Sequence, residues 1–236
     1  MPVLTPLEVE ALSLSLRVAT VSVAASLPFG LAAAWILARG RFPGMVVFDA
    51  LIHLPLVLPP VVVGYGLLLL FGRRGPIGAW LEDVLGVQVV FTWKGAALAA
   101  AVMAFPLMVR AMRLSLEAVD RGLEAAARTL GASRTRVFFT ITLPLMAPGI
   151  LAGAVLAFAR ALGEFGATIT FVSNIPGETR TLPIALYTLT QTPDAEAAAA
   201  RLALIAAGLA VLALIASEWL ARRLKSRIGE TREGTT

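Results

Sequence analysis

Long apolar blocks alternate with shorter polar or basic segments along the whole chain. A helix needs about 20 apolar residues to cross the hydrocarbon core of a bilayer, and five blocks reach or exceed this length. They cover about residues 11–38, 45–71, 93–112, 145–172 and 201–221. The pattern predicts an all-α integral membrane protein with five transmembrane helices, in which residues 1–236 form a single transmembrane domain.

Prolines interrupt the second of these blocks. Pro55, Pro59 and Pro60 predict a kink there, because proline cannot donate a helical hydrogen bond. Broken helices occur at membrane depth where they line a cavity or contact protein. The kink is therefore interpreted either as part of a path or as a permanent bend. A further apolar stretch at residues 182–189 is too short to span, and a re-entrant or interfacial helix is expected there.

Composition excludes a soluble fold and several kinds of chemistry. Hydrophobic residues make up 58% of the 236 and charged residues only 15%, against about 45–50% and about 25% in ordinary soluble domains. The chain has no cysteine and one histidine, His53. Disulfide frameworks, thiol catalysis, and cysteine- or histidine-rich metal sites are excluded. We predict no catalytic residue and no metal site, and a location in the cell membrane with several passes.

The basic residues lie mostly on one side of the predicted bundle. Of the 20 lysines and arginines, thirteen lie in residues 39–44, 110–144 and 222–232, five lie in the opposite loops, and two lie within blocks. The positive-inside rule then predicts a cytoplasmic C-terminus and an N-terminus outside. It also places a loop of about residues 113–144 in the cytoplasm and loops of about 72–92 and 173–200 outside. Topology accounts for the net charge of +5, so no nucleic-acid partner is expected.

The cytoplasmic stretch at residues 123–144 carries the clearest local signals. Three alanines at 125–127 favour a helix, Gly131 is suited to end it in a left-handed conformation, and Ser133 is suited to cap a second helix entering at Arg134. We expect two short helices across the mouth of the bundle, with a small-residue surface suited to docking into a groove on a cytoplasmic partner. The alternative is an amphipathic helix lying on the membrane surface.

This stretch resembles the coupling loop of ABC-importer permeases. Gly131 is followed at the family's spacing by Ile141, Leu143 and Pro144, while Glu124 stands one residue before the position of the family's acidic residue. The resemblance implies a type I ABC importer (MetI-like) permease core. It assigns contact with the ATPase to Glu124, Ala125, Ala126, Ala127, Gly131, Ala132, Ser133 and Arg134.

Four further segments are similar to the molybdate ABC-importer permeases, namely residues 53–64, 105–110, 162–171 and 173–181. The Gly-Glu-Phe-Gly core at 163–166 also occurs in sulfate and thiosulfate permeases. The resemblance implies a homodimer in the cell inner membrane, with two ATP-binding subunits at its cytoplasmic face and a molybdate-binding protein outside. The chain has no GxxxxGK[ST] phosphate loop. ATP and magnesium are therefore expected on the ATPase partner, this chain binds no cofactor of its own, and it is not an enzyme.

Two alternatives stay open. The first is a tungstate or sulfate/thiosulfate importer of the same architecture. The second is an ATP-independent secondary anion transporter or channel, for which a docking loop such as residues 113–144 would have no use.

Two charged residues within the fourth block have two interpretations. Arg160 and Glu164 are four residues apart, so their side chains can meet on one helix face. Charges in a span usually face a bundle interior or a water path. The pair either lines an anion path or is a mutually neutralising structural pair.

Asp49, near the start of the second block, is expected to pair with a loop arginine. The candidate path or gate residues are Pro59, Pro60, Arg160, Gly163, Glu164 and Gly166.

Overall fold

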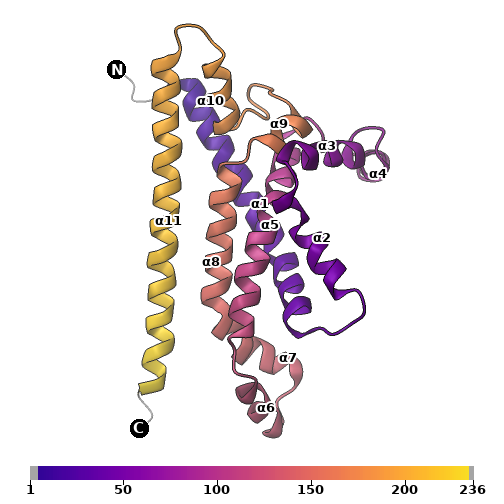
Figure 1. Cartoon of the computed structure of the whole chain (residues 1–236), viewed down its shortest axis with the longest axis vertical. Coiled ribbons are helices and arrows are strands. Elements are labelled where there is room, and N and C mark those ends of the chain that lie inside the picture. Colours follow the sequence, from indigo (N-terminus) through magenta and orange to yellow (C-terminus); the bar gives the residue numbers. More distant parts are fainter. Residues whose placement is uncertain (1–4, 234–236) are drawn as a thin grey trace.

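All the regular secondary structure in the described part of the chain is helical. The computed structural model describes residues 5–233, with side chains described to residue 216 and at Trp219; the side chains of the five basic residues between 222 and 232 lie outside the described set. The elements, drawn in Figure 1, are α1 (Pro6–Arg39), α2 (Met45–Val57), α3 (Pro60–Phe71), α4 (Pro76–Leu85), α5 (Trp93–Glu117), α6 (Arg121–Thr129), α7 (Arg134–Val137), the π-helical turn η1 (Phe138–Thr142), α8 (Leu143–Leu162), α9 (Gly166–Val172), α10 (Leu182–Thr190) and α11 (Glu196–Glu233). The predicted all-α membrane fold is confirmed.

Among the described residues, four helical stretches are long and apolar enough to cross a membrane: α1, α5, the continuous run Arg134–Leu162, and α11 over Glu196–Ala216. A fifth span is obtained when α2 and α3 are counted together. These two helices meet at an angle of 115°, which is much sharper than the kink expected from the sequence.

The break between α2 and α3 follows from the local sequence. Leu58 and Pro59 have extended ψ angles of 143° and 133°, because a residue before proline is disfavoured in the helical region. Pro60 then begins α3, at a helix position where a missing N–H costs nothing. Pro55 stays inside α2, so the Pro59–Pro60 pair, and not Pro55, determines where the chain turns.

The core of the fold is a bundle of α1, α5 and α8, with α5 at its centre. Small residues permit the close packing of α5 and α8. A Cβ on Gly149 would overlap the side chain of Ser115, and one on Gly153 would lie 3.0 Å from the Met108 carbonyl oxygen. Small residues four apart let helix backbones approach closely in membranes, so this spacing determines how α8 packs on α5.

The fourth apolar block is also divided. Helix α8 ends at Leu162, residues 163–165 are not helical, and α9 then packs against α3. The short apolar stretch at 182–189 forms α10, one short helix that does not span, in agreement with its length. α11 runs beside α8 along the bundle (Figure 1).

The two sets of predicted loops lie at opposite ends of the molecule. The start of α1, α10 and the start of α11 gather at one end, and α6 and α7 lie at the other end together with the last turns of α11 (Figure 1). At the first end Glu8 is 2.7 Å from Arg201 of α11, and Ser15 Oγ accepts a hydrogen bond from the Leu182 N–H at 2.7 Å. These contacts fasten α10 and α11 to α1.

Candidate functional site

The loop between α5 and α8 forms the predicted pair of short helices. Asp120 caps α6 by accepting from the Gly122 N–H at 2.7 Å, and Ser133 caps α7 by accepting from the Arg136 N–H at 3.2 Å. Gly131 has a φ of +86°. Its N–H donates to the Arg128 carbonyl, and the Ala132 N–H donates to the Ala127 carbonyl. This is the Schellman arrangement that ends a helix at a left-handed residue, so the expected conformation of Gly131 is found.

Glu124 points from α6 towards the body of the bundle. Its Oε1 lies 3.0 Å from Arg39 Nη2 at the end of α1 and accepts a hydrogen bond from the Thr142 hydroxyl at 2.8 Å. The side chains of Glu124 and Arg39 are each only 13% exposed. One carboxylate thus joins α6 to α1 and to η1.

Sequence reasoning did not identify Arg39 and Thr142 as its partners. One signal was present: a shift of one residue in an α-helix turns a side chain by about 100°. An acidic residue one position early therefore cannot face the way the family's residue does.

The two faces of α6 differ in character. Arg121, Glu124 and Arg128 share one face, which points to α1 and η1. The opposite face carries Leu123, 43% exposed, and Leu130 at the end of the helix, 89% exposed. Ala126, also exposed, lies between them. Single exposed apolar residues are ordinary, but a group of them on one face of a helix is a candidate surface for a protein partner.

The two interrupted helices meet at their breaks. A Cβ on Gly166, the first residue of α9, would be 2.8 Å from the Cβ of Pro60, and a Cβ on Gly64 would be 2.5 Å from the Ala167 carbonyl oxygen. The structure therefore brings together Pro60 and Gly166, two of the residues assigned to a path or gate. Pro59 and Gly163 belong to the same two non-helical connections.

Arg160 and Glu164 form an ion pair of 2.6 Å, but Glu164 lies beyond the end of α8 and not on it. The Glu164 side chain is 2% exposed and that of Arg160 is 28% exposed. The second carboxylate oxygen of Glu164 accepts from the Ala167 N–H at 2.8 Å, so it caps the first turn of α9. This geometry gives Glu164 a role in joining α8 to α9.

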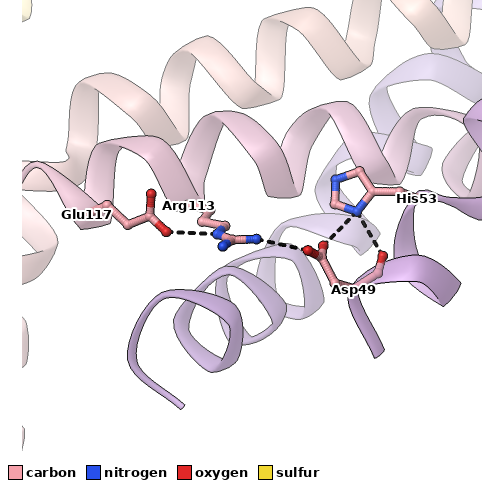
Figure 2. A network of polar contacts seen from close by, with 4 residues as sticks. All are labelled: Asp49, His53, Arg113 and Glu117. Atoms are coloured by element: carbon pink, nitrogen blue, oxygen red, sulfur yellow. Dashed lines mark hydrogen bonds and ion pairs between the residues drawn. The ribbon is translucent and has the colours of Figure 1, made fainter. Parts of the chain in front are cut away.

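A polar chain joins α2 to the last turns of α5 (Figure 2). Glu117 is 2.8 Å from Arg113, Arg113 is 3.2 Å from Asp49, and Asp49 is 2.9 Å from His53 Nδ1. These four residues and Arg110 line a cavity of about 540 Å³. Asp49 pairs with an arginine as expected, but Arg113 belongs to helix α5, which continues to Glu117, and not to a loop. Sequence reasoning gave no role to Glu117, although its spacing from Arg113 is that of a helical ion pair.

No group of three or more His, Asp or Glu side chains suited to a metal ion occurs within the described residues.

Comparison with known proteins identifies the family. Residues 26–226 match the family described as "Binding-protein-dependent transport system inner membrane component". The chain belongs to this family. It is therefore a multi-pass inner membrane protein of a binding-protein-dependent transport system.

Similar proteins cover almost the whole chain. The molybdenum transport system permease protein ModB of Escherichia coli K12 is 63% identical over 227 residues, which are 96% of this chain and 99% of that protein. ModB of Haemophilus influenzae is 58% identical over 95% of this chain and 98% of its own length. The sulfate transport system permease protein CysW of Synechocystis is 41% identical over 90% of this chain and 76% of its own length.

Solved structures share the fold. A bacterial ABC transporter that imports alginate superimposes with a TM-score of 0.72 at 16% identity, covering 93% of this chain and 80% of the other. The MetNI methionine ABC transporter in an inward-facing conformation superimposes with a TM-score of 0.70 at 17% identity, covering 92% of this chain and 96% of the other. The predicted MetI-like permease core is confirmed.

Proposed function

We propose that this chain is the permease subunit of an ABC importer for molybdate. The observation that carries the proposal is the graded similarity. Relatives named for molybdenum transport range from 63% and 58% identity over nearly their full lengths down to 45% and 42% over about 77–79% of theirs. Those named for sulfate are 41% and 40% identical over 76% and 72% of theirs, so the two relatives of high identity are what favour molybdate. Tungstate and sulfate or thiosulfate are the competing substrates.

A second copy of this chain would complete the path. None of the residues of α2 is buried, and Val46 and Val57 are each 82% exposed. The cavity lined by Asp49, His53 and Arg113 opens beside this helix. Charged groups at membrane depth face a bundle interior or a water path and avoid lipid. These features support a homodimer in which α2 and α3 of both copies enclose the route of the anion.

ATP hydrolysis would be supplied by two copies of a separate subunit, which bind ATP and magnesium, while this chain holds no cofactor. The exposed apolar face of α6, with Leu123, Ala126 and Leu130, is suited to fill a groove on that subunit. Gly131, Ala132, Ser133 and Arg134 follow in the turn and the start of α7. The excess of basic residues in this loop and the C-terminus supports a cytoplasmic position for both.

The contacts suggest how the ATPase would drive the path. Closure of the two ATPase subunits displaces α6 and α7. The displacement passes through Glu124 to Arg39 and Thr142, and through η1 into α8. It reaches the breaks at which Gly166 meets Pro60. Molybdate is delivered at the opposite end, where α4 and α10 lie, by an extracytoplasmic binding protein.

The proposal is tested by purifying the tagged chain in detergent from its native membrane and identifying the proteins that elute with it. We expect a stoichiometric ATPase subunit whose vanadate-sensitive activity is stimulated by a molybdate-loaded binding protein and not by a sulfate-loaded one. Stimulation of the ATPase only by a sulfate-loaded or tungstate-loaded binding protein would mean that this oxyanion, and not molybdate, is the substrate. A chain that elutes alone and still moves molybdate into liposomes would be an ATP-independent carrier, and the proposal would be wrong.

A further inference from the structure

A strongly basic pocket lies between the end of α1 and the two loop helices. It has a volume of about 370 Å³ and is lined by four arginines, Arg39, Arg121, Arg128 and Arg134, with Glu124 as its one acidic residue among those described. Glu124 is already paired with Arg39. In the described part of the chain, the other three arginines form no ion pair.

Arg39, which lines the pocket, has a buried donor without an acceptor. Arg39 Nε is buried and makes no hydrogen bond within the described residues, although its Nη2 contacts Glu124. A buried N–H without a partner is costly. Arg121, Arg128 and Arg134 are exposed and without an ion pair in the described part of the chain, although Arg128 Nε donates to the Glu124 carbonyl oxygen at 3.2 Å. An oxyanion of the phosphate type would supply the negative charge that these three side chains lack.

An apolar groove continues from this pocket along the outside of α1. The groove has a volume of about 530 Å³ and is lined by Pro28, Leu31, Ala32 and Ile36. The pocket and the groove share three residues, Trp35, Phe138 and Arg134. The rings of Trp35 and Phe138 are packed edge to face with centroids 5.1 Å apart.

The groove follows the outer surface of the bundle. The α1 residues that pack into the core, such as Ala33, Ala34 and Leu37, lie on the opposite side of the helix. A basic pocket joined to an apolar groove on the membrane-facing side has the shape of a phospholipid, with a charged head and an apolar tail.

We propose that the pocket and the groove bind one anionic phospholipid of the inner leaflet, with the headgroup phosphate against Arg121, Arg128 and Arg134 and an acyl chain along α1. The assignment to the inner leaflet rests on the orientation given under the proposed function. Most of this site is separate from the surface proposed for the ATPase, because the Leu123 and Leu130 face of α6 lies on the other side of the helix from Arg121 and Arg128, while Arg134 borders both.

The site is tested with the complete importer in phosphatidylcholine vesicles that contain brominated phosphatidylglycerol or brominated phosphatidylcholine. Bromine quenches nearby tryptophan fluorescence, and Trp35 lies at the junction of pocket and groove. We expect stronger quenching by the brominated phosphatidylglycerol at equal mole fraction, and loss of this excess in Trp35→Phe. Each arginine near a membrane surface strengthens the attraction for anionic lipid about fivefold. The variant Arg121→Gln/Arg128→Gln should therefore lower the preference for phosphatidylglycerol by at least about tenfold.

A matched control is Arg136→Gln, which removes a charge from the same loop at a residue that lines neither the pocket nor the groove. Arg136→Gln should keep the full excess of quenching by brominated phosphatidylglycerol over brominated phosphatidylcholine. Equal quenching by the two lipids, or an equal loss of preference in Arg136→Gln, would overturn the proposal. A response of Trp35 to inorganic phosphate without any preference for phosphatidylglycerol would identify a soluble anion site and would also overturn it. Fluorescence quenching requires no transport. A failure of the lipid proposal is therefore distinguishable from a failure of the proposed transport function.

Discussion

Gly64 of α3 lies directly against the backbone of Ala167 in α9. A Cβ added to Gly64 would be 2.5 Å from the Ala167 carbonyl oxygen and 2.9 Å from its Cα. Only a residue without a side chain permits this distance, and the contact joins two helices that each begin at a break in an apolar block.

Substitution of Gly64 by alanine should therefore separate α3 from α9. The neighbouring atoms are backbone and cannot turn away, so we expect a loss of about 1–3 kcal/mol in stability and a severe loss of transport. The matched control is Gly66→Ala, two residues along the same helix, where an added Cβ meets nothing within 4 Å. Thermal unfolding in detergent and molybdate uptake check both variants. Equal behaviour of the two would contradict the close packing.

The carboxylate of Glu124 should couple the loop to α1. Glu124→Gln removes the ion pair with Arg39 and weakens the contact with Thr142. Both charged side chains are mostly buried, and we expect a loss of about 1.5–3 kcal/mol. A double-mutant cycle with Arg39→Gln should give an interaction energy above about 0.5 kcal/mol.

The control for Glu124→Gln is Glu82→Gln, an exposed residue of α4, which should unfold like the unmodified chain. If the losses of stability in Glu124→Gln and Arg39→Gln simply add in the double variant, the two side chains have no interaction energy and this prediction is wrong. Stimulated ATPase activity should persist in Glu124→Gln while uptake per ATP falls, because the loop still binds its partner but moves α1 less effectively.

Gly131 should matter for docking more than for folding. Its φ of +86° makes any other residue strained, while an added Cβ would project into open space. We expect Gly131→Trp to reach the membrane but to copurify with several-fold less ATPase. Gly86→Trp is the matched control, because Gly86 also has a positive φ and an empty Cβ direction, in the loop at the other end. Normal uptake by the Gly131 variant would refute the assignment of this loop.

The exposed face of α2 can be tested by cross-linking, since the chain has no cysteine. A cysteine introduced as Val57→Cys should join two copies through a bifunctional maleimide, and a band of twice the mass should appear in native membranes. Leu204→Cys on α11 is the control, because Leu204 is 74% exposed and α11 lies on the opposite side of the bundle from α2 in Figure 1. Cross-linking at both positions, or at neither, would contradict a homodimer built on α2.

The sequence predicts the local features well, because they depend on neighbours in the chain. The Schellman turn at Gly131 and the cap at Ser133 follow from rules that involve four or five residues. The proline pair at 59–60 indicates that a break can occur. It does not give the direction of α3, which is determined by contact with Gly166 and Ala167, about a hundred residues later.

The partners of charged residues were hardest to foresee. Glu124 and Arg39 are 85 residues apart, and no periodicity connects them. Arg160 and Glu164 are four residues apart, as in a continuous helix, yet α8 ends between them. Their spacing correctly indicated the ion pair, whereas the cap that Glu164 provides to α9 depends on a break that apolar composition does not reveal.

The π-helical turn η1 leaves no loop between α7 and α8. Residues 134–162 form one helical run without a non-helical break, with a contour length of about 43 Å, although a π-helical turn and an internal proline are places where a helix bends. No flexible loop separates α7 from residue 163. Under the proposed function, a displacement of α7 would therefore enter α8 without crossing a loop and would end at Glu164, next to the break where Gly166 meets Pro60.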